Sequence, residues 1–144
     1  MRRRTFVAAL PAVLAVAACG DGAGPGSGPE PPPPPPPPAP PPGPVPGANV
    51  TVNIEDNAFV DPAGRRNGDA EVTIRSGETV GWRHMGANPH TVTSTDVPSG
   101  AQAFDSGTIG HNDTFTVTPS VAGTYMYYCA THPSIMVGAR IVVT

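Results

Sequence analysis

A proline-rich stretch near the N-terminus decides how much of this chain can fold into a compact domain. Residues 31–38 are consecutive prolines, and 15 of the chain's 21 prolines lie between residues 20 and 47. Val45 is the one branched apolar residue in that stretch, which has no aromatic residue, so it cannot bury enough surface to offset the entropy of ordering. We therefore expect residues 19–47 to be a disordered Gly/Pro-rich linker and residues 48–144 to form one domain.

The composition of the linker predicts a spacer with a flexible start. Proline fixes φ near the polyproline II value and lacks a backbone donor. At about 3.1 Å per residue, residues 29–46 could span on the order of 55 Å as a semi-rigid rod. Residues 20–28 are rich in glycine and predict a hinge. A docking peptide for an aromatic groove is the alternative use of such prolines.

The N-terminal residues 1–18 have the organisation of a signal peptide. Arginines at positions 2–4 precede an apolar run at residues 6–18, which is too short for a typical membrane span. The run ends in Val-Ala-Ala followed by Cys19, which resembles a bacterial lipobox. The resemblance implies that Cys19 is lipidated and that the protein is a membrane-anchored lipoprotein of the bacterial cell envelope, exported to its periplasmic side. An ordinary cleavage site with an incidental Cys19 is the alternative.

The rest of the chain alternates apolar and polar residues with a period of two, which is typical of strands with one buried face. Val50, Val52 and Ile54 alternate with Thr51 and Asn53. The pattern recurs at residues 72–74, 80–82, 115–117, 124–129 and 139–143. Turn-forming residues separate these segments, and no window has a convincing helical period. The pattern predicts an all-β sandwich, with Trp82, Tyr125 and Tyr127 in its core.

The charge of the domain excludes one class of partner. Its acidic residues outnumber its arginines by four, and the chain has no lysine. Phosphate backbones are bound by clustered positive charge, so we do not expect a nucleic-acid partner.

A cluster of potential metal ligands follows the segment at residues 124–129. Cys129 is the one cysteine of the predicted domain, and His132 and Met136 come shortly after it. A lone thiol in an exported protein is either a buried apolar residue or a metal ligand, and composition alone leaves both open. Sulfur and imidazole together favour copper or zinc, and one cysteine, two histidines and a weak axial methionine are the blue-copper set. His90, which we expect at the start of a strand, could supply the second histidine.

Several segments of the domain together resemble a known family. They are Val80-Gly81-Trp82, Pro89-His90-Thr91-Val92-Thr93, Gly123-Thr124-Tyr125-Met126-Tyr127-Tyr128-Cys129, His132-Pro133 and Met136-Val137-Gly138. The domain is similar to the cupredoxins of the plastocyanin and amicyanin branch. The resemblance implies a Greek-key β-sandwich or barrel, one type 1 copper ion, the ligands His90, Cys129 and His132, and Met136 as the axial ligand.

One loop departs from the pattern. Three residues, Pro133, Ser134 and Ile135, separate His132 from Met136. This spacing is longer than in amicyanins and shorter than in plastocyanins. Met126 is the nearest rival, but it lies three residues before Cys129 on a strand and should face the other side. We expect the remaining histidines, His84 and His111, to face solvent.

The resemblance implies a monomeric single-electron carrier of the cell envelope. Its partners would be redox proteins such as c-type cytochromes or oxidases, with the membrane reached through the lipid on Cys19. An enzyme is not expected, because copper enzymes need further histidines for a second copper and the chain has no His-X-His pair. The alternative function is a copper chaperone or storage protein of the envelope, which would use the same ligands.

Overall fold

The computed structural model describes residues 43–144; the predicted signal peptide, Cys19 and most of the predicted linker lie outside the described residues. Within that range the chain is all-β, as the sequence predicts. Its elements are β1 (Val50–Glu55), β2 (Ala58–Val60), the short 3₁₀ helix η1 (Asn67–Asp69), β3 (Glu71–Ile74), β4 (Val80–His84), β5 (Thr93–Asp96), β6 (Thr114–Val117), β7 (Gly123–Tyr128) and β8 (Ala139–Val143).

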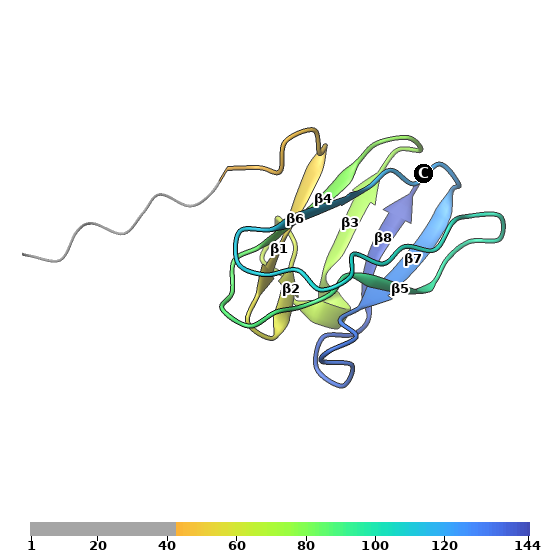
Figure 1. Ribbon diagram of the computed structural model, residues 1–144. Helices are drawn as coiled ribbons and strands as arrows, with labels where there is room; N and C mark the ends of the chain where they lie inside the picture. Colours follow the sequence, from red (N-terminus) through yellow and green to blue (C-terminus); the bar gives the residue numbers. More distant parts are fainter. Residues whose placement is uncertain (1–42) are drawn as a thin grey trace, which may run out of the picture. The chain divides into compact units, whose positions relative to one another are not determined.

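The strands form two four-stranded sheets that face each other (Figure 1). One sheet has the order β2-β1-β4-β6 and the other the order β3-β8-β7-β5. Both sheets are mixed, because β1 pairs with β4 and β3 with β8 in parallel while the other pairs are antiparallel. Non-consecutive strands are therefore neighbours, which is the cupredoxin-like sandwich that the resemblance implied.

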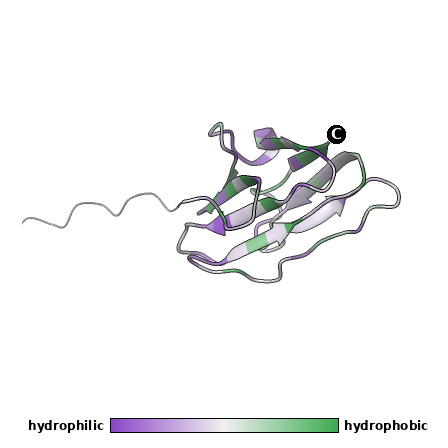
Figure 2. Ribbon diagram, turned by 90° about the horizontal axis from the view of Figure 1, so that it is seen from above, coloured by the Kyte–Doolittle hydropathy of each residue, from purple (hydrophilic) through white to green (hydrophobic). Residues whose placement is uncertain are grey.

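The core lies between the sheets and is made by the inward-facing residues of the alternating pattern. Hydrophobic and hydrophilic residues alternate along several strands (Figure 2). Trp82 is fully buried, and its ring lies 5.3 Å from that of Tyr127 in an edge-to-face arrangement. Tyr125 is also buried and its hydroxyl donates to Val121 O. The prediction that these three aromatic residues belong to the core is confirmed.

Two strands do not have the period-two pattern. All three residues of β2 are buried, so no polar residue alternates with them. The residues of β5 are Thr93, Ser94, Thr95 and Asp96, and this strand begins later than the start that we expected at His90. His90 instead forms an isolated bridge with Ile109, with hydrogen bonds of 3.0 and 2.9 Å in both directions.

The packed part of the domain begins before Ala48. Val45, which the sequence places in the linker, is buried, and its N–H donates to Thr51 Oγ1 at 3.0 Å. A Cβ on Gly81 would lie 2.8 Å from the Cβ of Val45, so the two backbones pack too closely for a side chain there. The last residues of the predicted linker therefore contact strand β4.

A buried carboxylate organises the connection between β2 and β3. Asp61 Oδ1 accepts the N–H groups of Ala63 and Arg65, both at 2.9 Å. Its Oδ2 accepts Arg65 Nε at 2.7 Å and the Glu71 N–H at 3.1 Å. Burial alone would raise the pKa of Asp61, but these donors outweigh it and hold the pKa below the ordinary value of 3.8.

We expect Asp61→Asn to lower the free energy of unfolding at pH 7 by about 2–3 kcal/mol, because buried donors lose their charged acceptor. A depressed pKa in the folded state stabilises the protein above the unfolded pKa, and this contribution is lost as the pH falls through the folded pKa. The difference between the variant and the wild type should therefore shrink below about pH 4. Urea unfolding from pH 3 to 7 measures it, with the exposed Asp69→Asn as the control. Equal stabilities at pH 7 would show that the Asp61 charge contributes nothing.

Candidate metal centre

The predicted ligands lie on two loops at one end of the sandwich. His90 is in the connection between β4 and β5, and Cys129 follows directly after the last residue of β7. His132 and Met136 are in the loop between β7 and β8, which projects from the end of the domain opposite the C-terminus (Figure 1). The sandwich thus brings a histidine and a cysteine 39 residues apart to the same place.

The potential ligand atoms of His90, Cys129 and His132 converge. Cys129 Sγ lies 3.5 Å from His90 Nδ1 and 3.7 Å from His132 Nδ1, and the two nitrogens are 3.1 Å apart. His90 and Cys129 are fully buried, whereas His132 is partly exposed. These are the three residues of the described chain that group as a possible metal site.

The size and chemistry of this triangle fit a transition metal. Three donors at about 2.0–2.3 Å from a central ion form a triangle with sides of about 3.5–4.0 Å. Both sulfur–nitrogen distances fall in or near that range, and the nitrogen–nitrogen distance is shorter. Two imidazole nitrogens and one thiolate in a trigonal arrangement are the equatorial donors of a blue-copper site.

Hydrogen bonds within the β7–β8 loop fold Met136 back towards Cys129. The Cys129 N–H donates to Met136 O at 2.8 Å, and the Met136 N–H donates to His132 O at 3.0 Å. Met136 is fully buried. Met126, the rival candidate, is partly buried and alternates with the buried Tyr125 and Tyr127, so it faces the other side of β7 as expected. Met136 as the axial ligand stays a prediction.

The surroundings of Cys129 favour its thiolate. The sulfur accepts the Thr91 N–H at 3.3 Å and lies 3.0 Å from the Thr131 hydroxyl. Burial alone would raise the pKa of the Cys129 thiol, but the hydrogen bonds from Thr131, Thr91 and His132 outweigh it and lower the pKa to about 7. The thiolate, which is the form that binds metals, is therefore accessible near neutral pH.

The buried position of His90 favours its uncharged ring, which is also the form that binds a metal. Burial, together with the neighbouring His132 and His84 rings, lowers the pKa of His90 below the ordinary value of 6.5.

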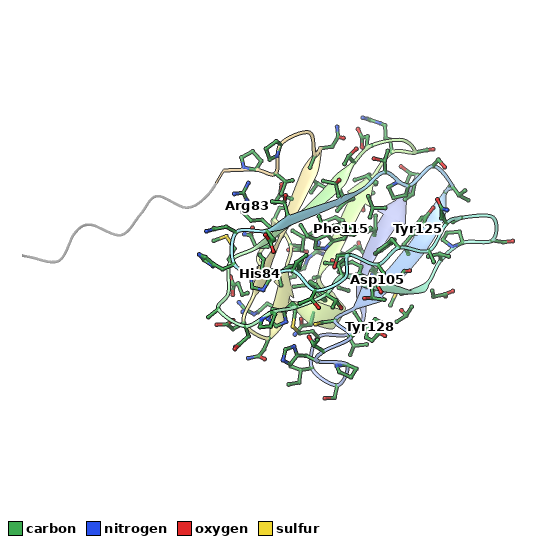
Figure 3. The ribbon with its side chains drawn as sticks, viewed as in Figure 1. Arg83, His84, Asp105, Phe115, Tyr125 and Tyr128 are labelled. Atoms are coloured by element: carbon green, nitrogen blue, oxygen red, sulfur yellow. The ribbon has the colours of Figure 1, made fainter. Side chains whose placement is uncertain are left out.

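The other two histidines differ from each other. His111 is exposed, as expected, and its Nδ1 lies 3.1 Å from Gly86 O. The expectation for His84 is wrong, because its side chain is fully buried and its ring stacks on that of His90. Figure 3 labels His84 among the side chains of the domain. His84 is the last residue of β4 and follows the buried Val80 and Trp82 at a spacing of two residues. That periodicity is the signal in the sequence that could have placed it inside.

Exposed apolar residues lie on the two loops that carry the ligands. Ile135 and Val137 of the same loop are the two large hydrophobic side chains that are most open to solvent in the described residues, at 53% and 45%. Ala87 and Pro89 of the other loop are also exposed, and the Thr131 hydroxyl lies 3.5 Å from Pro89 O, which links the two loops. We call these four side chains the apolar rim. No helix within residues 43–144 is long and apolar enough to cross a membrane.

The chain is similar to known copper proteins. Residues 65–144 match the family model described as copper binding proteins of the plastocyanin/azurin family. The chain is 33% identical over 84 residues to amicyanin from Paracoccus versutus, an alignment that covers 58% of each protein. It is 35% identical over 72 residues to plastocyanin from Scenedesmus fuscus, covering 44% of this chain and 70% of that protein. The chain thus spans less than two thirds of the length of the amicyanin relative.

Solved structures show the same fold. The crystal structure of amicyanin from Paracoccus versutus superposes with a TM-score of 0.53 at 29% identity, covering 69% of this chain and 85% of that chain. A purple cupredoxin from Nitrosopumilus maritimus superposes with a TM-score of 0.52 at 27% identity, covering 67% of this chain and all of that one. With the family match over more than half of its length, this chain belongs to the plastocyanin/azurin family of copper binding proteins, and its cofactor is one type 1 copper ion.

Proposed function

We propose that this protein is a single-electron carrier of the bacterial cell envelope. The observation that carries the proposal is the convergence of His90 Nδ1, Cys129 Sγ and His132 Nδ1 in one triangle, in which two residues are buried and His132 is partly exposed. These residues would hold copper, with Met136 as the axial ligand. Bound there, copper would supply one-electron chemistry, with a potential tuned by the axial ligand and by hydrogen bonds to the sulfur.

The scaffold supports electron transfer because it holds the donors in place independently of a metal. His90 exchanges two backbone hydrogen bonds with Ile109, and Cys129 is joined to Met136 and His132 by backbone hydrogen bonds. Ligands held in this way move little when the charge of a bound ion changes, which favours fast exchange. A cavity of about 630 Å³ lies elsewhere in the described residues and is lined by none of the donor residues. The fixed positions of the donors are what support a carrier.

The N-terminal features suggest how such a carrier would reach its partners. Lipidated Cys19 would anchor the protein, and the proline-rich residues before Val45 would act as a spacer that holds the domain near membrane-bound redox proteins. A tether of this kind replaces strong binding with a high effective concentration. Weak docking through a small apolar surface then suffices, and c-type cytochromes or oxidases are the partners that we propose.

His132 is the ligand through which we expect electrons to leave, because it is the one donor of the three with exposed surface. A charge in the apolar rim should disturb docking there. We expect Ala87→Asp to slow electron exchange with a c-type cytochrome by about 3- to 10-fold without shifting the reduction potential. Stopped-flow kinetics and potentiometry measure the two quantities.

Thr124→Asp is the matched control for this experiment. Thr124 is exposed near the start of β7, whereas Cys129 follows the end of that strand, which places the new charge about 17 Å along the strand from the site. It adds the same charge and should leave the exchange rate unchanged. If Ala87→Asp and Thr124→Asp have the same rate as the wild type, electrons leave by another face.

A further inference from the structure

We propose that His84 is a positioning residue for the copper site, which fixes the ring plane and the tautomer of His90. This inference rests on the proposed function. The two rings are stacked, with centroids 5.2 Å apart and planes at 28° to each other. His84 and His90 are both fully buried. A buried imidazole at the core-facing end of β4 costs free energy unless its polar atoms find partners, so its presence there needs a reason.

The hydrogen bond of His84 identifies its tautomer. His84 Nε2 lies 2.8 Å from Asn88 O. A carbonyl oxygen accepts and never donates, so Nε2 carries the hydrogen. In the neutral ring, His84 Nδ1 is then a bare acceptor, and it is buried without a hydrogen-bond partner among the described residues.

His90 has the complementary arrangement. Its Nδ1 faces Cys129 Sγ and His132 Nδ1, so its hydrogen belongs on Nε2 when Nδ1 is a ligand. Within the described residues His90 Nε2 is also buried without a partner. Metal-binding histidines almost always donate their second N–H to an acceptor. The unpaired acceptor of the adjacent ring, His84 Nδ1, is the candidate, reached through one water molecule because the stacked rings make no direct hydrogen bond with each other.

His84 also holds the loop that leads to His90. The Asn88 carbonyl accepts from His84, and the Asn88 N–H donates to Asp56 Oδ1 at 3.0 Å. The same carboxylate oxygen accepts the Ala87 N–H at 2.8 Å. Asn88 is thus held on both sides, two residues before the ligand. Pro89 comes between them, and its ring restricts φ, so the position of Asn88 is passed on to His90.

The first experiment reads the tautomers in the wild-type protein. In ¹H–¹⁵N NMR of the Cu(I)-loaded full chain, we expect His84 and His90 each to carry a hydrogen on Nε2 that exchanges slowly with water. A hydrogen on His84 Nδ1 would overturn the proposal, because the ring would then offer His90 no acceptor. This measurement needs no variant, so it decides even if substitutions at His84 prevent folding.

The second experiment measures copper affinity in variants. His84→Phe keeps a stacked ring but loses both nitrogens, and we expect its copper affinity to fall by 10- to 100-fold, the usual loss when a partner of a ligating histidine is removed. The copper hyperfine splitting of its Cu(II) form should change as well. His84→Gln, which can still donate to Asn88 O and offers an amide acceptor, should restore most of the affinity. His111→Phe is the matched control at an exposed histidine of the same end of the domain.

A residue that merely fills the core would give a different result. His84→Phe would then change the melting temperature of the copper-free protein, while copper affinity and hyperfine splitting stayed at wild-type values. That outcome overturns the proposal and leaves the electron-carrier function intact. Failure of the proposed function is separate, since it is seen in the wild type as a lack of copper binding or of reversible redox change.

Discussion

Replacing Cys129 with serine should abolish the intense visible band of the copper-loaded protein and weaken copper binding by more than about 100-fold. Cys129 is the one thiol of the described chain, its sulfur is fully buried, and both histidine nitrogens of the triangle face it. A serine hydroxyl keeps the size of the side chain but is a harder and much weaker ligand than a thiolate. Absorption spectra and competition with a copper chelator measure the two effects.

The control for this variant is His111→Ala, which removes an imidazole side chain from the same end of the domain but outside the triangle. It should keep the wild-type spectrum and affinity. A Cys129→Ser protein that stays blue would show that the sulfur of Cys129 is not the source of the colour, and the ligand set proposed above would be wrong.

Replacing Met136 with glutamine should keep copper bound while lowering the reduction potential. An oxygen donor favours Cu(II) over Cu(I) relative to a thioether. A tenfold change in the relative affinity for the two oxidation states corresponds to about 59 mV in a one-electron couple, and we expect a fall of at least that size. Potentiometric titration of the folded variant measures it.

Met126→Gln is the matched control, because Met126 lies on the opposite face of β7 from Cys129. It should leave the potential unchanged. If Met126→Gln lowers the potential and Met136→Gln does not, the methionines have been assigned the wrong way round. If neither variant moves it, the axial position belongs to another group.

Most of the fold could be predicted from the sequence because one face of most strands is buried. Val52, Ile54, Val80 and Trp82 alternate with more polar neighbours, and these segments are strands β1 and β4. Strand β2 was not predicted, because all of its residues are buried and apolar and polar residues do not alternate in it. The contact of Val45 with β4 was not predicted either, for a different reason. A single apolar residue among prolines has no periodicity, and its burial depends on a distant glycine, Gly81.

The candidate site was predictable only where its ligands have a local sequence signal. Cys129, His132 and Met136 lie close together after a predicted strand, and the family resemblance added His90. The residues around them lack such a signal. Asp56 reaches the loop before His90 from a turn more than 30 residues away, which only the tertiary structure shows. His84 has the periodicity of a core residue, but histidines are more common at the surface of proteins. The prediction followed the residue type rather than the periodicity and was therefore wrong.

The visible absorption spectrum of the copper-loaded full chain, recorded through cycles of oxidant and reductant, tests the central claim most directly. We predict one copper ion per chain and an intense thiolate-to-copper band, which bleaches on reduction and returns fully on oxidation. Repeated cycles should leave the amplitude unchanged, as expected of a carrier. A colourless and stable Cu(I) complex that does not reoxidise would contradict electron transfer and favour copper storage or delivery.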